Sequence, residues 1–244
     1  GYLAYQALAA ADRGVKVRLL IDDMDARAKN YTFAALDAHP NIDVRMFNPF
    51  RSRAGSLGVA VEALGSFSRI NRRMHNKTWI ADNRLAVVGG RNLGDEYFGA
   101  SDEVNFVDLD FAMVGPVVRE ASASFDRYWN SAAAYPMQLL APDDVSAEAL
   151  ASLRTRVASL VPQAQSSRYA TELGRNDAVQ RLLSGGLPLQ WSGEFRFVSD
   201  DPLKAHGRQH GLAGSEVLAW LWPAMERSRS LLAISPYFVP GEAG

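Results

Sequence analysis

A histidine and a lysine stand two residues apart at His75 and Lys77, and Asp82 follows, which gives the spacing H-x-K-x4-D. The apolar and β-branched residues around them predict a strand over Met74–Ala81. Residues i and i+2 of a strand point to one face, so we expect the imidazole and the ammonium to project together. A neutral ring nitrogen can attack phosphorus while a nearby cation offsets charge on the nonbridging oxygens. The pattern therefore predicts phosphodiester chemistry that requires no metal.

A glycine pair, Gly89-Gly90, follows at the exit of a predicted hairpin, whose second strand covers residues 85–88. Glycines let backbone amides approach an anion closely, and Asn92 adds a side-chain donor. We therefore predict that Lys77, Gly90 and Asn92 bind the phosphate. Asp82 falls in the polar turn of the hairpin, away from the face of the histidine, and is assigned a structural role.

A simpler interpretation exists for the same residues. His75 would be an ordinary strand histidine, Lys77 a solvated charge, and the glycines a turn that closes a hairpin. The motif spacing alone arises by chance in roughly one chain in a hundred of this composition. The glycine pair and Asn92, at a distance that suits a hairpin, favour the catalytic interpretation.

The composition predicts a globular protein of one or two units, because 48% of the 244 residues are hydrophobic and 22% are charged. A formal net charge of -1 excludes a global basic field, so no nucleic-acid partner is expected. The chain has no cysteine, which excludes disulfides, thiolate zinc sites and thiol nucleophiles. No apolar run is long enough to span a membrane.

Positive charge is concentrated between residues 51 and 91, where eight basic residues stand against two acidic ones, for a local net of +6. This excess would suit an anionic headgroup or an anionic bilayer surface. A solvated face is the alternative. The basic residues are Arg51, Arg53, Arg69, Arg72, Arg73, Lys77, Arg84 and Arg91.

Two other clusters suggest cation binding but favour simpler explanations. His206 and His210 have the spacing of helical metal ligands, yet Gly207 and Gly211 indicate a loop. The acidic residues at 22, 23 and 25 follow a strand pattern, as polar loops after sheet strands commonly do. We therefore predict no metal and no other cofactor.

Helix and strand patterns alternate along the chain and predict an α/β fold, a mixed β-sheet flanked by helices on both faces. The predicted helices cover residues 3–12, 31–38, 56–70, 116–129, 145–160, 172–183 and 215–229. The predicted strands cover residues 15–21, 42–47, 74–81, 85–88, 104–114, 195–198 and 231–237.

Three regions are expected along the chain. Residues 1–135 would form a first catalytic half, 136–194 a connecting or insert region, and 195–244 the start of a second half. Both ends read as interrupted: the first residues resemble the middle of a helix, and the last follow a strand pattern. We expect the sequence to be truncated at both ends.

The stretch from 71 to 98 resembles the first half-site of bacterial cardiolipin synthases of the phospholipase D superfamily. The similarity is carried by Asn71-Arg72-Arg73-Met74-His75-Asn76-Lys77, by Asp82-Asn83, and by Val88-Gly89-Gly90-Arg91-Asn92-Leu93-Gly94-Asp95-Glu96-Tyr97-Phe98. Weaker similarities lie at Phe47-Asn48-Pro49-Phe50, Asp108-Leu109-Asp110, Gly115-Pro116-Val117-Val118, 125–129 and 235–241.

The resemblance implies the phospholipase D-type sandwich and a phosphatidyltransferase that acts on phospholipids through a phosphohistidine. A hydrolase or nuclease of the same superfamily and a noncatalytic lipid-surface module are the alternatives. By motif match, His75 and Lys77 are catalytic. Asp108 is our choice to orient His75, with Glu103 and Asp110 as rivals.

The resemblance also implies partners. The active site of such enzymes combines two H-x-K motifs, and this sequence has no second one. The second half-site would come from a missing part of the same chain or from a dimer, and the isolated chain should be inactive. The implied substrate is a lipid like phosphatidylglycerol, and the implied location is bacterial, peripheral to the inner membrane.

Overall fold

A computed structural model of the 244-residue chain describes residues 2–23, 30–49, 74–98, 101, 103–177, 180–181, 184–186, 189–205 and 215–232. Several sequence predictions lie outside these ranges. They are the acidic position 25, the helix over 56–70, the motif flank 71–73, Phe50, His206 and His210, and the similarity at 235–241.

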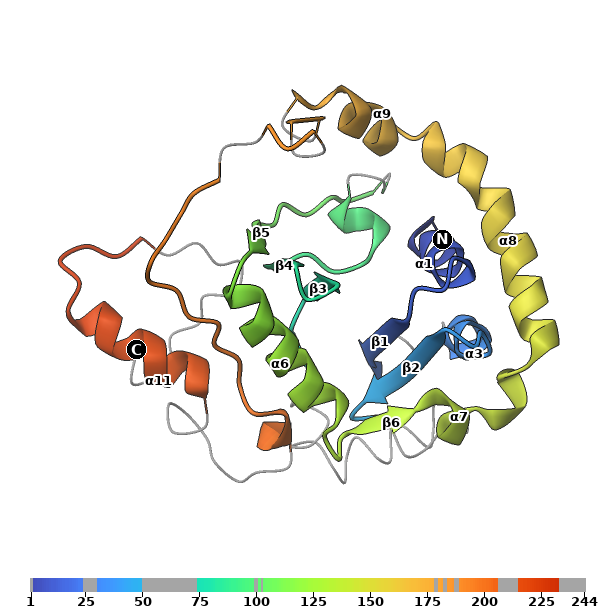
Figure 1. The fold of residues 1–244 in the computed structure, drawn as a ribbon, viewed down its shortest axis with the longest axis horizontal. Coiled ribbons are helices and arrows are strands. Elements are labelled where there is room, and N and C mark those ends of the chain that lie inside the picture. The colour runs from blue at the N-terminus through green and yellow to red at the C-terminus, as the bar shows by residue number, and fades with distance from the viewer. Residues whose placement is uncertain are drawn as a thin grey trace.

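The described chain contains both helices and strands, as Figure 1 shows. The helices are α1 (Tyr2–Asp12), α3 (Asn30–Asp37), α6 (Val117–Trp129), α7 (Met137–Leu140), α8 (Ala147–Gln165), α9 (Arg168–Arg175) and α11 (Glu216–Glu226), with short 3-10 turns η2 (Asp95–Tyr97), η3 (Pro142–Asp144) and η4 (Pro202–Ala205). The strands are β1 (Val17–Asp22), β2 (Ile42–Phe47), β3 (Thr78–Ala81), β4 (Leu85–Gly89), β5 (Asp110–Val114) and β6 (Ala134–Pro136).

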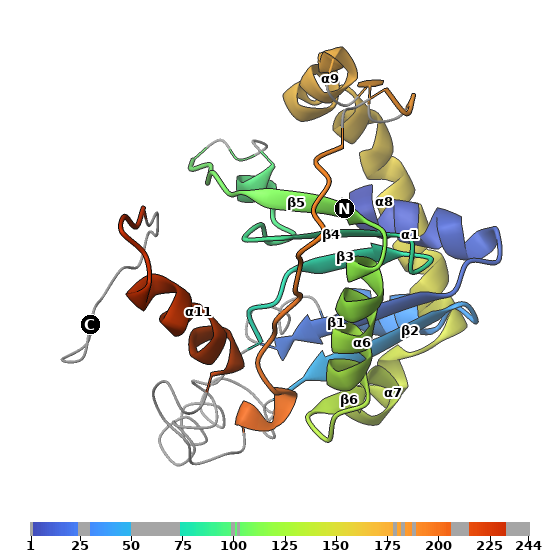
Figure 2. The same cartoon turned by 60° about the vertical axis from the view of Figure 1, so that its left-hand side comes forward.

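The strands of the described chain form two three-stranded sheets, ordered β1-β2-β6 and β3-β4-β5. β1 and β2 run parallel, with Val17 opposite Ile42 and Asp22 opposite Phe47, and the other pairings are antiparallel. Figure 2 shows the two sheets one above the other, with β3 beside β1. The predicted α/β class is confirmed, although the predicted sheet is divided in two.

Strand β2 contributes side chains to two different cores. Ile42, Val44 and Met46 are buried in a cluster with residues of α1, α3, α7 and α8. Phe47, at the end of the strand, instead packs with Tyr128 of α6, their ring centroids 5.5 Å apart. This strand is therefore covered on both sides.

Helix α6 crosses both sheets on the face opposite α1, α3 and α8 (Figures 1 and 2). Val118 and Ala121 near its start pack on Ala86 of β4. Near its end, the Trp129 ring lies 4.5 Å from the guanidinium of Arg45 on β2, and the Trp129 carbonyl accepts a 2.7 Å hydrogen bond from the same side chain. One helix thus joins the two sheets.

Helix α8 belongs to the same core, although its residues lie within the predicted connecting region. Ser146 caps its start by accepting a hydrogen bond from the Ala149 amide, and Leu153 and Val157 are buried. Arg154 donates two hydrogen bonds to Asp12 of α1, at 2.7 and 2.8 Å, which holds the pKa of that carboxyl well below its usual range. The helix therefore packs onto the first half of the chain.

The segment after residue 190 runs along α6 (Figures 1 and 2). The prediction of a strand over 195–198 is wrong, since these residues have no regular secondary structure. The segment bonds to α6 instead: the Phe197 amide donates to Glu120, and Ser199 shares a 2.7 Å hydrogen bond with Ser124. The segment leads to α11, which is capped by Ser215 and buries no residue.

Candidate active site

The motif begins before the hairpin that carries it. Residues 74–77 have no regular secondary structure, and β3 starts at Thr78, so the predicted strand over 74–81 is too long at its start. The Gly89 amide still donates to the Lys77 carbonyl at 3.3 Å. At the other end, the Met74 amide donates to Asp22 of β1 at 3.1 Å. The motif segment therefore bridges the two sheets.

His75 is exposed, whereas Lys77 is half-buried. Burial lowers the pKa of Lys77 below its ordinary value, and the carboxylates of Asp108 and Asp22 oppose this shift by attracting the ammonium. The lysine is thus a partly desolvated cation that two acidic groups attract. That the His75 and Lys77 side chains share one face stays a prediction.

Asp108 lies so close to Gly90 that position 90 has no room for a side chain. A methyl group on Gly90 would overlap with the Asp108 Oδ1 atom. The negative charge of the Asp108 carboxylate also favours the charged form of Lys77. The structure therefore places Asp108 against Gly90, with its charge acting on Lys77, while the bond from Asp108 to His75 stays a prediction.

The two rivals of Asp108 have other surroundings. The carboxylate of Asp110 accepts a 2.7 Å hydrogen bond from Arg91. Glu103 is exposed in a turn, where its amide donates to Ser101. Of the three carboxylates, only Asp108 is among the charges that act on Lys77. Which of them orients His75 stays a prediction.

Arg91, which the sequence places in the basic cluster and in the family-like stretch, has a structural role that the sequence does not predict. Besides its bond to Asp110, it donates to the carbonyls of Asp108, at 3.2 Å, and Tyr97, and its guanidinium lies 5.6 Å from the centre of the Phe98 ring. It thereby fixes the loop after β4 against the segment before β5. One signal in the sequence could have predicted this role. A basic residue between Gly90 and Asn92 can pair with the acidic residues at 108 and 110.

Asn92 is exposed, and its amide nitrogen donates to the Tyr97 hydroxyl at 2.9 Å. An amide group has two N–H donors, so one is left for a ligand. Its predicted contact with phosphate is compatible with this geometry and stays a prediction.

Asp82 lies in the turn at the far end of the hairpin from His75. The backbone φ angles of Asp82 and Asn83 are 52° and 55°, the positive values that type I′ turns require at both central positions. The Arg84 amide donates to the Ala81 carbonyl at 2.9 Å and closes the turn. The geometry agrees with a structural role for Asp82.

Five members of the basic cluster lie outside the described residues: Arg51, Arg53, Arg69, Arg72 and Arg73. The other three differ in their surroundings, because Lys77 is half-buried, Arg84 is exposed and Arg91 is paired with Asp110. The described part of the cluster therefore offers only the lysine to a phosphate at the motif.

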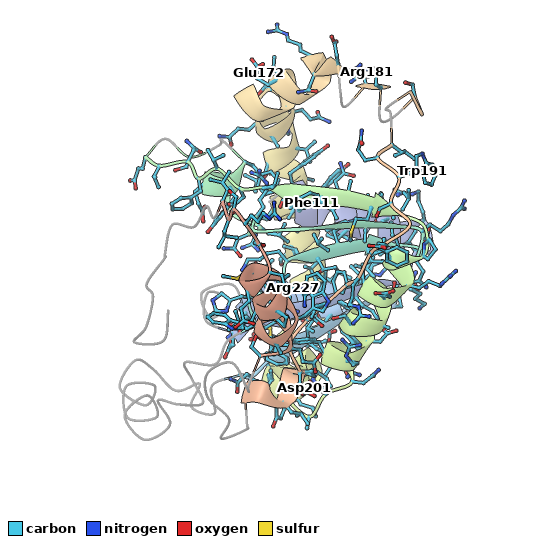
Figure 3. The ribbon with its side chains drawn as sticks, turned by 90° about the vertical axis from the view of Figure 1, so that its left-hand side faces the viewer. Phe111, Glu172, Arg181, Trp191, Asp201 and Arg227 are labelled. Carbon is cyan, nitrogen blue, oxygen red and sulfur yellow. The ribbon has the colours of Figure 1, made fainter. Side chains whose placement is uncertain are left out.

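The remaining surface features lie apart from the motif. A hollow lined by Asp177, Gln180, Arg181 and Ser184 contains none of the predicted site residues. Figure 3 shows Glu172 and Arg181 at that end of the molecule, away from Phe111 on β5. Within the described ranges, no helix has the length and apolarity to cross a membrane, and no three acidic or histidine side chains gather as metal ligands would.

The two glycines should respond differently to alanine. In Gly90→Ala the new methyl group meets the end of a side chain, Asp108, which can rotate away from Lys77. In Gly89→Ala it meets the Asp110 carboxylate and also the Leu109 carbonyl, at 2.5 Å, which is part of the backbone and cannot rotate away. We expect Gly90→Ala to lower the activity of the full-length protein about tenfold or more with a nearly unchanged Tm. Gly89→Ala should lower the Tm itself; equal Tm losses in both variants would contradict this.

Comparison with known proteins gives a family match over residues 2–129, to the model described as "Cardiolipin synthase, PLD-like domain". The chain is 40% identical over 248 residues to cardiolipin synthase C of Escherichia coli, a match that covers 100% of this chain and 50% of that protein. It is 33% identical over 244 residues to an uncharacterized protein of Helicobacter pylori, covering 98% of this chain and 47% of the relative.

A cardiolipin synthase of Staphylococcus aureus is 30% identical over 126 residues, which are 50% of this chain and 23% of that protein. The chain thus spans about half the length of the first two relatives. No solved structure shows a significant match to it.

Proposed function

Because the chain belongs to the family of cardiolipin synthase PLD-like domains, we propose that the full-length protein is a phosphatidyltransferase whose first half-site contains His75 and Lys77. The observation that carries the proposal is the half-buried lysine beside an exposed histidine, next to the Gly90 loop. An exposed imidazole is accessible to a large substrate, and a desolvated ammonium interacts strongly with a phosphate.

The proposed reaction has two displacements at phosphorus. In the first, a motif histidine attacks the phosphodiester, the P–N bond forms, and the bond to the leaving alcohol breaks as the other motif histidine donates a proton. In the second, the glycerol hydroxyl of another phosphatidylglycerol loses its proton to that group and attacks phosphorus, which releases the first histidine. The products are cardiolipin and glycerol.

Each local residue has a role in this proposal. Lys77 holds the nonbridging oxygens, and Gly90 leaves room for a phosphate near its backbone. Asn92 donates its remaining N–H. Asp108, beside Lys77 and Gly90, orients the imidazole and keeps the lysine charged.

The second half-site would be contributed by the rest of a longer protein or by a second chain, because this sequence holds one H-x-K motif. The substrate would be reached at the surface of the bacterial inner membrane, by peripheral association. The matching relatives are named as synthases of cardiolipin, a membrane lipid, and this supports a site of action at a membrane surface.

The test is to incubate the full-length protein with vesicles that contain radiolabelled phosphatidylglycerol and to separate the products. Cardiolipin and glycerol in equal amounts are the expected result. Phosphatidic acid and glycerol without cardiolipin would mean that water is the acceptor, and the protein would be a hydrolase. Unchanged lipid would contradict the proposed function.

The alkaline limb of the pH profile should reflect the burial of Lys77. The proposal needs the ammonium form, and a lowered pKa means that this form is lost at a lower pH than for an exposed lysine. Activity should therefore fall with rising pH before ordinary lysines titrate. In Lys77→Arg, whose guanidinium stays protonated, the residual activity should keep its level to higher pH. Identical alkaline limbs in the wild type and in Lys77→Arg would contradict the role of Lys77.

A further inference from the structure

The side chain of Arg91 joins three segments around the proposed phosphate site. Its Nε atom donates to the Asp110 carboxylate on β5 at 2.7 Å, its Nη2 atom to the Asp108 carbonyl at 3.2 Å, and its Nη1 atom to the Tyr97 carbonyl. Tyr97 in turn contacts the side chain of Asn92. We infer that Arg91 is a positioning residue that sets the places of Asp108 and Asn92 around the phosphate, an inference that rests on the proposed function.

The sheet pairing ends just before the residues that Arg91 holds. The register of β4 and β5 runs as far as Asp110, and a further bond from the Gly90 amide to the Leu109 carbonyl is 3.4 Å long. A hydrogen bond of that length is weak. The guanidinium adds charge-assisted bonds to the Asp110 carboxylate and the Asp108 carbonyl, which are stronger than bonds between neutral groups. Arg91 therefore holds the backbone of Asp108 where its carboxylate lies against Gly90.

Tyr97 carries the effect of Arg91 to Asn92. Its carbonyl accepts a hydrogen bond from the guanidinium, and its hydroxyl accepts a 2.9 Å bond from the Asn92 amide nitrogen. Its ring packs against Phe106, with the ring centroids 5.1 Å apart. Because Asn92 is exposed, a fixed hydroxyl beside it limits the rotation of its amide group. A shift of Tyr97 would therefore move the donor that we expect to bind the phosphate.

Arginine suits this position because its guanidinium presents five N–H groups in one plane. Three of its nitrogens bond to acceptors of three different residues. A lysine would keep the positive charge and could still pair with Asp110, but its single nitrogen cannot reach all three acceptors at once. The variant Arg91→Lys therefore separates the geometry of the network from its charge.

A second consequence concerns the ammonium of Lys77. The charges of Asp108 and Asp22 favour the charged form of Lys77 and oppose the lowering of its pKa by burial. If Asp108 moves away in Arg91→Lys, the pKa of Lys77 should fall further. The ammonium form would then be lost at a lower pH, and the alkaline limb of the activity profile should move to lower pH. A residue that only stabilises the fold would leave this limb in place.

The experiment measures kcat, KM and the pH profile of transfer per folded molecule, in the full-length protein with phosphatidylglycerol vesicles. Arg91→Lys should lower kcat about tenfold with little change in KM, and it should shift the alkaline limb to lower pH. Arg45→Lys is the matched control, because Arg45 also donates to a backbone carbonyl, that of Trp129, and lies over an aromatic ring. This control should lower the Tm and keep the kcat and the alkaline limb of the wild type.

Tyr97→Phe tests the branch through Asn92. The variant keeps the ring and the carbonyl and loses only the hydroxyl, so it keeps the test decisive if Arg91→Lys does not fold. It should lower kcat about threefold or more and leave the alkaline limb in place, because Asp108 is not displaced. In a protein that already carries Asn92→Ala, Tyr97→Phe should have no further effect, since the hydroxyl acts through that amide.

The outcomes separate the two levels of the argument. An inactive wild type, or an active His75→Ala variant, contradicts the proposed function. If the wild type is active and His75→Ala is not, a normal kcat and alkaline limb in Arg91→Lys contradict the positioning role alone. A raised KM with an unchanged kcat in Arg91→Lys would also contradict it, because that result indicates direct binding of the substrate by Arg91. Losses that multiply when Tyr97→Phe is added to Asn92→Ala would contradict the branch through Asn92.

Discussion

Replacing His75 with alanine in the full-length protein should lower phosphatidyl transfer by at least about 1000-fold. His75 is a reacting group whether it acts as the nucleophile or as the acid and base. As nucleophile it forms the bond to phosphorus, and as acid and base it supplies and removes the proton. The side chain is exposed, so its removal creates no cavity in the core. The Tm should therefore stay within a few degrees of the wild type.

A second histidine provides the contrast. His39 is buried. Its Nδ1 atom accepts a hydrogen bond from the Asn41 amide, and its Nε2 atom lies 3.1 Å from Asp12 Oδ1. His39→Ala should lower the Tm and leave kcat per folded molecule unchanged. Transfer at the wild-type rate by His75→Ala would show that His75 takes no part in the chemistry.

Replacing Lys77 with methionine should lower kcat by about 100- to 1000-fold. Methionine keeps the length and the apolar stem of the side chain but removes the charge that offsets the phosphate oxygens. Since that charge acts most strongly on the transition state, kcat should fall more than KM rises. Burial of the ammonium makes the loss larger than for a solvated cation.

Arg84→Met is the matched control for Lys77→Met. Arg84 belongs to the same basic cluster in the sequence, but it is exposed in the turn at the other end of the hairpin. Its replacement should leave kcat unchanged. Equal losses in the two variants would indicate that the cluster acts as a diffuse surface charge, and Lys77 would then have no specific role.

The parts of the fold that the sequence predicts well are those with a strong local pattern. The strand over 42–47 is found at those bounds, because every second residue enters the core and the alternation is regular. Helix α6 was expected over 116–129 and begins at Val117, with Pro116 before it. In both cases periodicity and the end signals agree.

The errors occur where a strand needs a partner from elsewhere in the chain. The strand predicted over 104–114 is present only as Asp110–Val114, since Gly89, opposite Asp110, is the last residue of β4. Val107 and Leu109, outside that pairing, are exposed. Apolar residues predict an extended chain, but pairing is decided by tertiary structure.

Short and nonlocal features were missed for a related reason. Strand β6 has three residues and forms only by pairing with β2, so it carries almost no local signal. The pairing of Arg91 with Asp110 spans 19 positions, and the contact of Met74 with Asp22 spans 52. The motif spacing identified His75 and Lys77, but the residues that surround them come from distant segments.

The central claim is that His75, Lys77 and Asn92 converge on one phosphate, and a crystal structure of the full-length protein with orthovanadate tests it most directly. The expected result is a vanadate about 3 Å from a ring nitrogen of His75, with the Lys77 ammonium and the Asn92 amide in contact with its oxygens. Vanadate bound elsewhere, or His75 and Lys77 side chains on opposite sides of their segment with the anion bound to neither, would contradict the claim.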